Sequence, residues 1–375
     1  MRRISIDSVR PGMVNAKNIY SASGKNLLSK GVVINEFYIR RLKALGVHSL
    51  YVQDGIVDDI VLPEVISEKT RVEMVRTVHH VFTNLSSDRA LNTRAIQNII
   101  GNIIEEIFLN SDVLIQVIDI RAFDDYTFQH SINVCLISLM IGTTLAFNQS
   151  KLRDLGVGAL LHDVGKIKLN KAIIEKPGAL TPREYEEIKK HTVYGFEILK
   201  NYFEISLLSS HVAFQHHERN DGSGYPRGLL NKEIHEYARI VSVVDVYDAL
   251  ISDRSYRSAF SSGQALEEIR RLSGIKFDPE VVAALIKNVA KYPVGTIVQL
   301  SNGDIGVVID VSKKNRERPV VRRFMDGSRR VVQGEIKLTD FPEIQIVKTF
   351  EDEETYHAIR RIIRGDQVLP DVGRP

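Results

Sequence analysis

The segment Leu160-Leu161-His162-Asp163-Val164-Gly165-Lys166 carries the strongest chemical signal in this chain. It follows an apolar run of helical spacing and ends in a glycine turn, where an adjacent imidazole and carboxylate can reach the same small volume. At such a turn the carboxylate can bridge two cations, and the imidazole can supply a nitrogen ligand to one of them. Lys166 is close enough to hold a phosphate near the same cations. Because adjacent His-Asp pairs are also common on surfaces, the pair alone does not establish a metal site.

The composition is that of an ordinary globular protein. The chain has 375 residues, of which 43% are hydrophobic and 26% charged, and this length favours two or three domains. The net charge of +3 is too small to indicate nucleic acid or a membrane surface, so an anionic ligand must be held by local cations. The single cysteine, Cys135, excludes an internal disulfide and lies in an apolar run that predicts burial. Because the sequence shows no signal-peptide core and no apolar run of bilayer length, we expect a cytoplasmic protein without a membrane span.

Two segments precede the signal segment. Residues 1–62 predict a β-rich module with one helix, which Asn35 caps and which runs to Leu45. We interpret this module as structural or as a docking unit, with regulatory ligand binding as the alternative. Residues 63–120 predict a helical connector that packs on the next domain or forms a dimer contact. Its pair His79-His80 has no carboxylate nearby in sequence, so we interpret both as helix-surface or packing residues.

The C-terminal part changes from helical to strand periodicity. Residues 291–345 predict a small antiparallel β-sheet or barrel with hairpin turns at Asn302-Gly303 and Asp326-Gly327, and residues 346–375 predict a helix and a tail. RNA binding is an alternative role for four basic residues of this part: Arg322, Arg323, Arg329 and Arg330. Alternation along strands favours solvated faces instead, since aromatic stacking partners are nearly absent.

Residues 121–290 hold the candidate chemistry. Seven of the eleven histidines lie between His130 and His235, on what the periodicity predicts to be at least five helices. One of these helices begins at the capping box Thr181-Pro182-Arg183-Glu184 and is predicted to run to Phe203. Helical bundles build metal sites from one or two inward-facing ligands on each helix. The candidate ligands are His130, His162, Asp163, His191, His216, His217 and Asp245.

Each candidate also has an ordinary explanation, such as a helix-end residue, a surface histidine or a loop pair. Asp245 is the exception, because it interrupts the apolar helix Ile240–Val246, and a buried carboxylate without a cationic partner is costly. The set as a whole is therefore more specific than any of its members.

The ordered set resembles the HD superfamily of metal-dependent phosphohydrolases. The run from His216 to Pro226 matches the HHExxDGxGYP signature of the HD-GYP subfamily, and Asp163 to Lys166 match its HD-x-GK segment. Tyr126-Thr127 before His130, and Asp245 to Leu250, match as well. The resemblance covers about residues 120–290, and the two flanking modules resemble those of some family members more weakly.

The resemblance implies an all-helical domain with two, sometimes three, metal ions, often iron or manganese, and hydrolysis of cyclic di-GMP to linear pGpG and in some members to GMP. It implies a first metal held by His130, His162, Asp163 and Asp245. It implies that Asp163 bridges to a second metal held by His191, His216 and His217. Contacts to substrate phosphates are implied for Lys166, Arg254 and Arg257. Trinuclear members have a glutamate at the position of Tyr126, so the resemblance favours a dinuclear site.

The implied chemistry agrees with these residue types. Two nearby cations lower the pKa of a bridging water and stabilise the charge that develops on a phosphodiester, so no covalent nucleophile is needed. Asp163 and Lys166 are then the expected catalytic residues, with Lys166 neutralising the substrate. The loop residues Asp221, Gly222, Gly224, Tyr225 and Pro226 are expected to shape the pocket or a partner surface, and a plain surface turn is the alternative.

The fold expected from the sequence is mainly α, with an all-helical HD-type domain between a β-rich N-terminal module and a small antiparallel β C-terminal module. The expected function is a cyclic di-GMP phosphodiesterase with two Fe or Mn ions. The alternatives are hydrolysis of another cyclic dinucleotide or a nucleotide polyphosphate, and a non-catalytic cyclic-dinucleotide receptor or scaffold. Expected partners are cyclic di-GMP and, through the GYP loop, a diguanylate cyclase or another signalling protein, but not DNA. A homodimer is left open.

Overall fold

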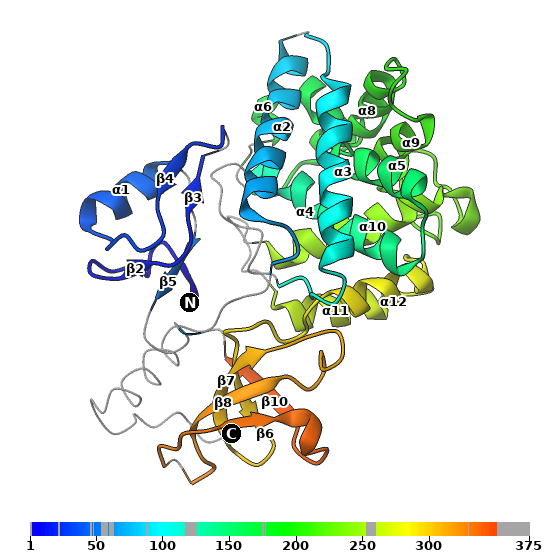
Figure 1. The fold of residues 1–375 in the computed structure, drawn as a ribbon. Helices are drawn as coiled ribbons and strands as arrows, with labels where there is room; N and C mark the ends of the chain where they lie inside the picture. Colours follow the sequence, from blue (N-terminus) through cyan, green and yellow to red (C-terminus); the bar gives the residue numbers. More distant parts are fainter. Residues whose placement is uncertain are drawn as a thin grey trace.

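The computed structural model describes residues 2–350 except 22, 46, 48, 54–58, 60–63, 88, 117–125, 175, 177, 253–259 and 329. A small β module with one helix comes first, a helical domain follows, and a β-sheet ends the described chain (Figure 1). This arrangement confirms the predicted fold class. Among the described residues, none of the helices has the length and apolar character needed to cross a membrane.

The N-terminal module has its own core. Its elements are β1 (Arg2–Ser5), β2 (Val14–Asn15), β3 (Ile19–Tyr20), β4 (Asn26–Leu28), α1 (Glu36–Ala44) and β5 (Ser49–Gln53). Three strands form an antiparallel sheet in the order β1-β5-β2, and β3 pairs with β4. The side chain of Asn35 accepts a hydrogen bond from the Tyr38 amide, which confirms the predicted helix start. Buried Ile34, Leu42 and Val52 belong to a hydrophobic cluster separate from that of the helical domain.

The predicted connector forms two helices, α2 (Glu68–Ser86) and α3 (Thr93–Leu109). They lie side by side, with α2 packed on α4 (Tyr126–Thr144) and α3 packed on α5 (Gln149–Leu160) (Figure 1). Buried Met74 of α2 and buried Ile99 and Ile103 of α3 share one hydrophobic cluster with Leu139 and Leu155. The connector is therefore part of the core of the helical domain. The metal-ligand groups found among the described residues include neither His79 nor His80.

The helical domain surrounds α4, which is buried on all sides from Gln129 to Gly142 and packs against α5, α10 and α12. Cys135 is fully buried there, as its apolar surroundings predict. The other elements are η2 (Val164–Lys168), α6 (Lys171–Ile174), α7 (Pro182–Lys189), α8 (His191–Leu199), α9 (Leu207–Gln215), η3 (Asn231–Glu233), α10 (Glu236–Ile251), α11 (Ser262–Arg271) and α12 (Pro279–Asn288).

The helix predicted from Thr181 to Phe203 is wrong in its extent. The Thr181 capping box and its start are confirmed, but α7 ends at Lys189 and α8 begins at His191. At the break, Gly165 of η2 comes so close to the backbone of His191 that a Cβ atom would have no room. His191 therefore opens a helix rather than lying in the middle of one.

The C-terminal sheet is antiparallel with strand order β10-β6-β7-β8-β9. Its elements are β6 (Ile297–Leu300), β7 (Ile305–Asp310), β8 (Val320–Met325), β9 (Glu335–Lys337), the short helix η4 (Leu338–Asp340) and β10 (Ile346–Phe350). The hairpin turn at Asn302-Gly303 is confirmed, with Gly303 at φ +88°. The predicted end of the β module at residue 345 is wrong, because β10 pairs with β6 and extends the sheet to Phe350. Residues 351–375 lie outside the described part of the chain.

Two of the four basic residues singled out in this sheet, Arg322 and Arg323, form ion pairs. Arg322 contacts Asp59 at 2.8 Å and Glu335 at 3.0 Å, and Arg323 contacts Asp304 at 3.2 Å. Paired arginines do not form the open cationic surface that RNA binding needs. These contacts favour the interpretation of solvated faces; Arg329 lies outside the described residues.

Candidate metal centre

The turn after α5 places His162 and Asp163 in the interior. Both side chains are buried, and Asp163 stands directly before η2. The Nδ1 atom of His162 lies 2.8 Å from the carbonyl oxygen of Ala159, to which it donates, so the lone pair is on Nε2. Lys166 of η2 donates to Oδ2 of Asp163. The predicted pair thus presents an imidazole nitrogen and a carboxylate to the same buried space.

Two further histidines are oriented in the same way. Nδ1 of His191 lies 2.6 Å from the carbonyl oxygen of Ile188, and Nδ1 of His216 lies 3.0 Å from that of Ala213. A backbone carbonyl on one ring nitrogen fixes the tautomer and leaves the other nitrogen free to bind a cation. His191 opens α8 and His216 follows α9, so the ends of two helices supply these ligands.

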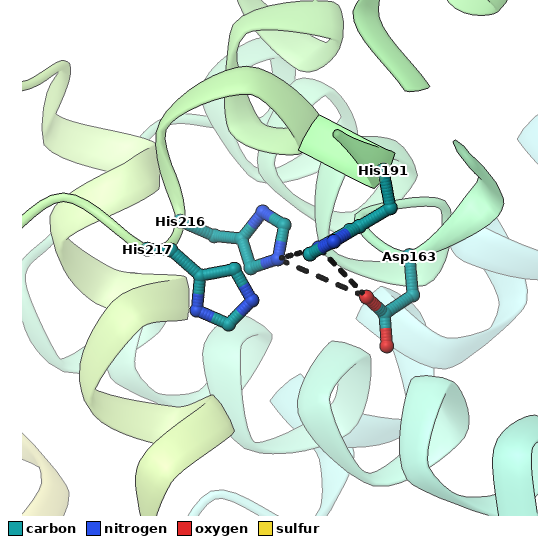
Figure 2. A group of neighbouring side chains, drawn as sticks. All are labelled: Asp163, His191, His216 and His217. Carbon is teal, nitrogen blue, oxygen red and sulfur yellow. Dashed lines mark hydrogen bonds and ion pairs between the residues drawn. The ribbon is translucent and has the colours of Figure 1, made fainter. Parts of the chain in front are cut away.

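One group of candidate ligands consists of Asp163, His191, His216 and His217. Figure 2 shows these side chains pointing toward one another. The Nε2 atoms of His191 and His216 are 3.3 Å apart, and Oδ1 of Asp163 lies 3.4 Å from the first and 3.8 Å from the second. The ligand atoms of the whole group lie within 4.8 Å of one another. Such a cluster has the size of a single metal site.

The second group consists of His130, His162 and Asp245. Nε2 of His130 lies 3.3 Å from Nε2 of His162 and 3.1 Å from Oδ1 of Asp245. Oδ2 of Asp163 lies 3.4 Å from Nε2 of His162, while its Oδ1 faces the first group. The carboxylate of Asp163 therefore lies between the two groups. The structure brings all seven predicted ligands together, and their role as ligands stays a prediction.

The arrangement fits divalent cations. The unprotonated Nε2 atoms of His191 and His216 are 3.3 Å apart and repel each other unless a cation lies between them. Oδ1 of Asp163 is buried and accepts no hydrogen bond from any residue that the structure describes, which is costly for a carboxylate oxygen without another partner. Imidazole and carboxylate ligands without cysteine suit iron, manganese or zinc.

Burial and neighbouring charges set the protonation of these groups. Burial lowers the pKa of His217 to about 3, lowers that of His191, and holds that of His216 well below its usual value, so these imidazoles are neutral at pH 7. Burial also lowers the pKa of His130, but its hydrogen bonds with Asp245 and Asp248 outweigh burial and raise it well above the usual value. A cation bound at His130 must displace that proton.

The two carboxylates remain ionised. Burial raises the pKa of Asp163, but the positive charge of Lys166 outweighs burial, and the pKa lies well below the usual value. Burial likewise raises the pKa of Asp245, and its hydrogen bond with His130 reverses that effect. Both residues are therefore anionic ligands in the interior at neutral pH.

Asp248 is a functional residue that the sequence reasoning missed. It is 1% exposed, and its Oδ2 lies 2.7 Å from Nδ1 of His130. Its Oδ1 accepts a hydrogen bond of 2.6 Å from the side-chain Nδ2 of Asn133. Asp248 therefore orients the His130 ring through Nδ1, the nitrogen that faces away from the other candidate ligands. The sequence does contain a sign of this role. Asp248 follows Asp245 by three residues, so both acids lie on one side of α10.

The GYP loop is fixed against His217, which belongs to the group that contains Asp163, His191 and His216. The carboxylate of Glu218, which is 1% exposed, accepts hydrogen bonds from the amides of Arg227 at 2.8 Å and Leu229 at 3.0 Å. The ring of Tyr225 stacks on His217 with centroids 4.7 Å apart. A Cβ atom on Gly224 would overlap the backbone of Glu218. These contacts favour a pocket wall over a plain surface turn.

The other predicted loop and substrate residues lie farther out or outside the described residues. Asp221 is exposed and accepts hydrogen bonds from Ser223, and Gly222 has φ +75°. Pro226 is exposed at the end of the loop. Arg254 and Arg257 lie outside the described residues, so their phosphate contacts stay predictions.

Comparison with known proteins agrees with this geometry. An HD domain family model matches residues 113–281, and a model for a KOW domain associated with HD domains matches residues 297–358. The chain is 32% identical over 251 residues to the cyclic di-GMP phosphodiesterase PA4108 of Pseudomonas aeruginosa. It is 40% identical over 190 residues to a cyclic di-GMP phosphodiesterase of Thermotoga maritima. The chain carries an HD domain of the HD-GYP family.

The matches to this HD-GYP domain are partial in length. They cover 67% and 49% of this chain, and 60% and 52% of the two relatives themselves. A 3'3'-cGAMP-specific phosphodiesterase of Vibrio cholerae is 36% identical over 168 residues, covering 45% of this chain and 36% of that relative. Among solved structures, Bd1817, a HDG"Y"P protein from Bdellovibrio bacteriovorus, aligns with 76% of this chain and 97% of its own at 19% identity and a TM-score of 0.49.

Proposed function

We propose that this chain is a metal-dependent phosphodiesterase that hydrolyses cyclic di-GMP to the linear dinucleotide pGpG. Two divalent cations, iron or manganese, are proposed to occupy the two ligand groups. The position of the Asp163 carboxylate carries this proposal. One of its oxygens faces His191 and His216, and the other faces His162 and His130. A carboxylate between two sets of imidazoles is suited to bridge two cations.

When bound, such a cation pair supplies a water of lowered pKa as the nucleophile and neutralises charge on the phosphodiester. The protein supplies orientation and further positive charge. Lys166 is anchored on Asp163, and its side chain is 31% exposed, so its ammonium is available to a phosphate oxygen beside the ligand groups. Asp248 and the backbone carbonyls hold the imidazoles in place.

The surroundings of the ligands favour a nucleotide over a simple phosphate ester. The ring of Tyr225 stacks on His217. The ring of Tyr185 stands edge-on to the ring of Tyr225, with the two centroids 6.3 Å apart. Tyr185 is 48% exposed, and the ammonium of Lys189 lies 5.4 Å from its ring centre. Exposed aromatic rings beside a phosphate-binding site are suited to stack on a base. Because relatives include both cyclic di-GMP and 3'3'-cGAMP phosphodiesterases, the mixed dinucleotide is the second candidate substrate.

The test compares Asp163→Ala and His162→Ala with the unchanged protein after anaerobic purification. We expect both variants to lose metal, measured by elemental analysis, and turnover, measured by chromatography of the products, while circular dichroism shows an intact fold. His211→Ala is the matched control, because this imidazole stacks on Phe196 and belongs to neither ligand group. Full activity of Asp163→Ala would refute the proposal.

The substrate is assigned by offering cyclic di-GMP, 3'3'-cGAMP and a guanosine polyphosphate to the metal-loaded protein at equal concentration. We expect cyclic di-GMP to give the highest kcat/KM and pGpG to be the first product. Faster hydrolysis of another member of the panel would reassign the substrate. Tight binding of cyclic di-GMP without product would indicate a receptor instead of an enzyme.

A further inference from the structure

A second cavity, distinct from the metal centre, lies where the helical domain meets the C-terminal sheet. It has a volume of about 540 Å³ and is lined by the C-terminal ends of α4 and α12 and by the segment between β7 and β8. Its wall residue Thr144 lies fourteen positions after His130 on α4, which is roughly 20 Å along a helix. None of the seven candidate metal ligands lines this cavity. The volume is within the range of sites for small organic ligands.

The lining is strongly cationic. Five cations, Lys287, Lys313, Lys314, Arg316 and Arg318, face one carboxylate, Glu317. Glu317 lies 3.7 Å from Lys291, a cation outside the lining, and 4.0 Å from Arg316. Its negative charge is thus shared and cannot balance the five cations.

Structural roles account for the two arginines. Arg318 donates to the carbonyl oxygens of Leu338, Phe341 and Ile344 at 2.9, 2.7 and 2.8 Å, which fixes its guanidinium without neutralising it. Arg316 donates to the carbonyl oxygen of Ile286 at 3.3 Å, near the end of α12, where a cation is favoured by the helix dipole.

The three lysines are not anchored in this way: Lys287 and Lys314 are exposed, and Lys313 is half-buried. Within the described ranges, no carboxylate lies within 4.0 Å of the ammonium of Lys287, Lys313 or Lys314, and these ammonium groups donate no hydrogen bond to a described residue. Burial lowers the pKa of Lys313, and the more distant charge of Asp112 offsets this effect only in part. Three unpaired ammonium groups around one concavity attract a multiply charged anion.

The floor of the cavity adds neutral polar groups. Asn288 is fully buried and donates from Nδ2 to Oγ1 of Thr144 at 2.7 Å and to the carbonyl oxygen of Ala284 at 2.8 Å. Because Oγ1 of Thr144 accepts this bond, its own hydrogen is free to be donated to a ligand oxygen. Ammonium groups, a fixed guanidinium and a hydroxyl donor together are suited to phosphate oxygens.

We propose that this cavity binds a phosphorylated ligand of nucleotide size. Its walls come from α4 and α12 on one side and from the β7–β8 segment on the other, so a bound phosphate holds the C-terminal sheet on the helical domain. The proposal does not depend on the reaction at the metal centre, because none of the candidate metal ligands lines the cavity.

Binding is measured by calorimetry on the full chain carrying Asp163→Ala and treated with chelator, so that the metal centre does not compete. The probes are guanosine 5'-monophosphate and pyrophosphate, with guanosine as the uncharged comparison. We expect both phosphates to bind, with affinity that falls as salt rises, and guanosine not to bind. In Lys313→Gln/Lys314→Gln the affinity is expected to fall about tenfold or more.

The matched control is Lys337→Gln/Lys348→Gln, which removes the same charge from β9 and β10 outside the cavity lining and is expected to bind like the parent. Equal binding in both double variants, or no binding of either phosphate at low salt, would overturn the proposal. Binding of a short RNA that depends on Lys313 and Lys314 without any binding of the small phosphates would also overturn it. Turnover is measured separately, on Lys313→Gln/Lys314→Gln in a chain that keeps Asp163. That measurement tests the metal centre and does not affect the binding result.

Discussion

Asp248 holds the imidazole of His130 through the ring nitrogen that does not face the other candidate ligands. Its negative charge stabilises the Nδ1–H form and makes Nε2 a stronger ligand. Asp248→Asn keeps the shape of the side chain and removes the charge. We expect metal affinity to fall about 10–100-fold, because outer partners of metal-bound histidines contribute on that scale.

The measurement is metal titration followed by turnover at saturating metal. Asp154→Asn is the matched control, because this carboxylate lies on α5 and contacts no candidate ligand. If Asp248→Asn binds metal as tightly as the parent, the orienting role is wrong. A parallel loss in both variants would indicate a general effect of removing a buried acid.

At the scale of single residues, the sequence pointed to the side chains that the structure brings together, but not to the residues that support them. His130 and Asp245 could be recognised because their types and order resemble a known motif. The contact between His130 and Asp248 joins positions 118 apart, and no local spacing reports such a distance. The orientation of the His191 ring likewise depends on the fold: its Nδ1 contacts the carbonyl oxygen of Ile188, whose position is set by the break between α7 and α8.

At the scale of elements, the contact between η2 and α8 sets the distance between Asp163 and His191. Gly165 lies against the backbone of His191 and Gly195 with no room for a Cβ atom. Gly165→Ala must push the two elements apart, and we expect it to cost about 1–3 kcal/mol or more of the free energy of unfolding and to weaken metal binding. Urea unfolding and metal titration measure the two effects.

Gly101→Ala is the comparison for this prediction. Gly101 lies in α3, and a Cβ atom there meets no other atom within 4 Å. The same substitution should therefore stabilise the protein by about 0.5–1 kcal/mol, since alanine loses less backbone entropy in a helix than glycine. A similar effect at both positions would show that helix propensity, not the close approach of η2 to α8, governs Gly165.

Helix starts were easier to predict than helix ends. Asn35 and Thr181 act through their own side chains on amides three residues later, so the signal is local. The end of α7 depends on Gly165, which lies 24 positions before Lys189, and on packing that the periodicity does not contain. Strand β10 was missed for a related reason, because its pairing with β6 is what makes it a strand.

At the scale of the whole molecule, hydrophobic periodicity predicted three parts but not the contacts between them. The polar contacts between the parts have no periodic pattern in the sequence. Lys17 of the N-terminal module contacts Glu64 at 2.7 Å, and Arg71 of α2 contacts the same carboxylate at 3.6 Å. Glu64 therefore links the module to the first helix that packs on the helical domain.

The charge of Glu64 makes this link depend on pH. Burial raises the pKa of its carboxyl, but the charges of Arg71 and Lys17 outweigh burial and lower the pKa below its usual value. A carboxyl with a lowered pKa stabilises the folded state above its unfolded pKa, and this contribution is lost as pH falls through the folded pKa. The link is therefore complete at pH 7 and weakens below about pH 4.5.

Glu64→Gln removes the charge and keeps the shape of the side chain. We expect it to lower the free energy of unfolding at pH 7 by about 1–2 kcal/mol and to expose β3 and β4 to hydrogen exchange, because two charged partners lose their acceptor. At pH 4 the difference from the parent should shrink, since the carboxyl of the unfolded parent chain takes up protons below about pH 4.5 while the folded carboxyl, with its lowered pKa, is still largely ionised. Glu73→Gln on the exposed side of α2 is the control and should change neither quantity. A loss of equal size at both pH values would show that Glu64 acts through packing and not through its charge.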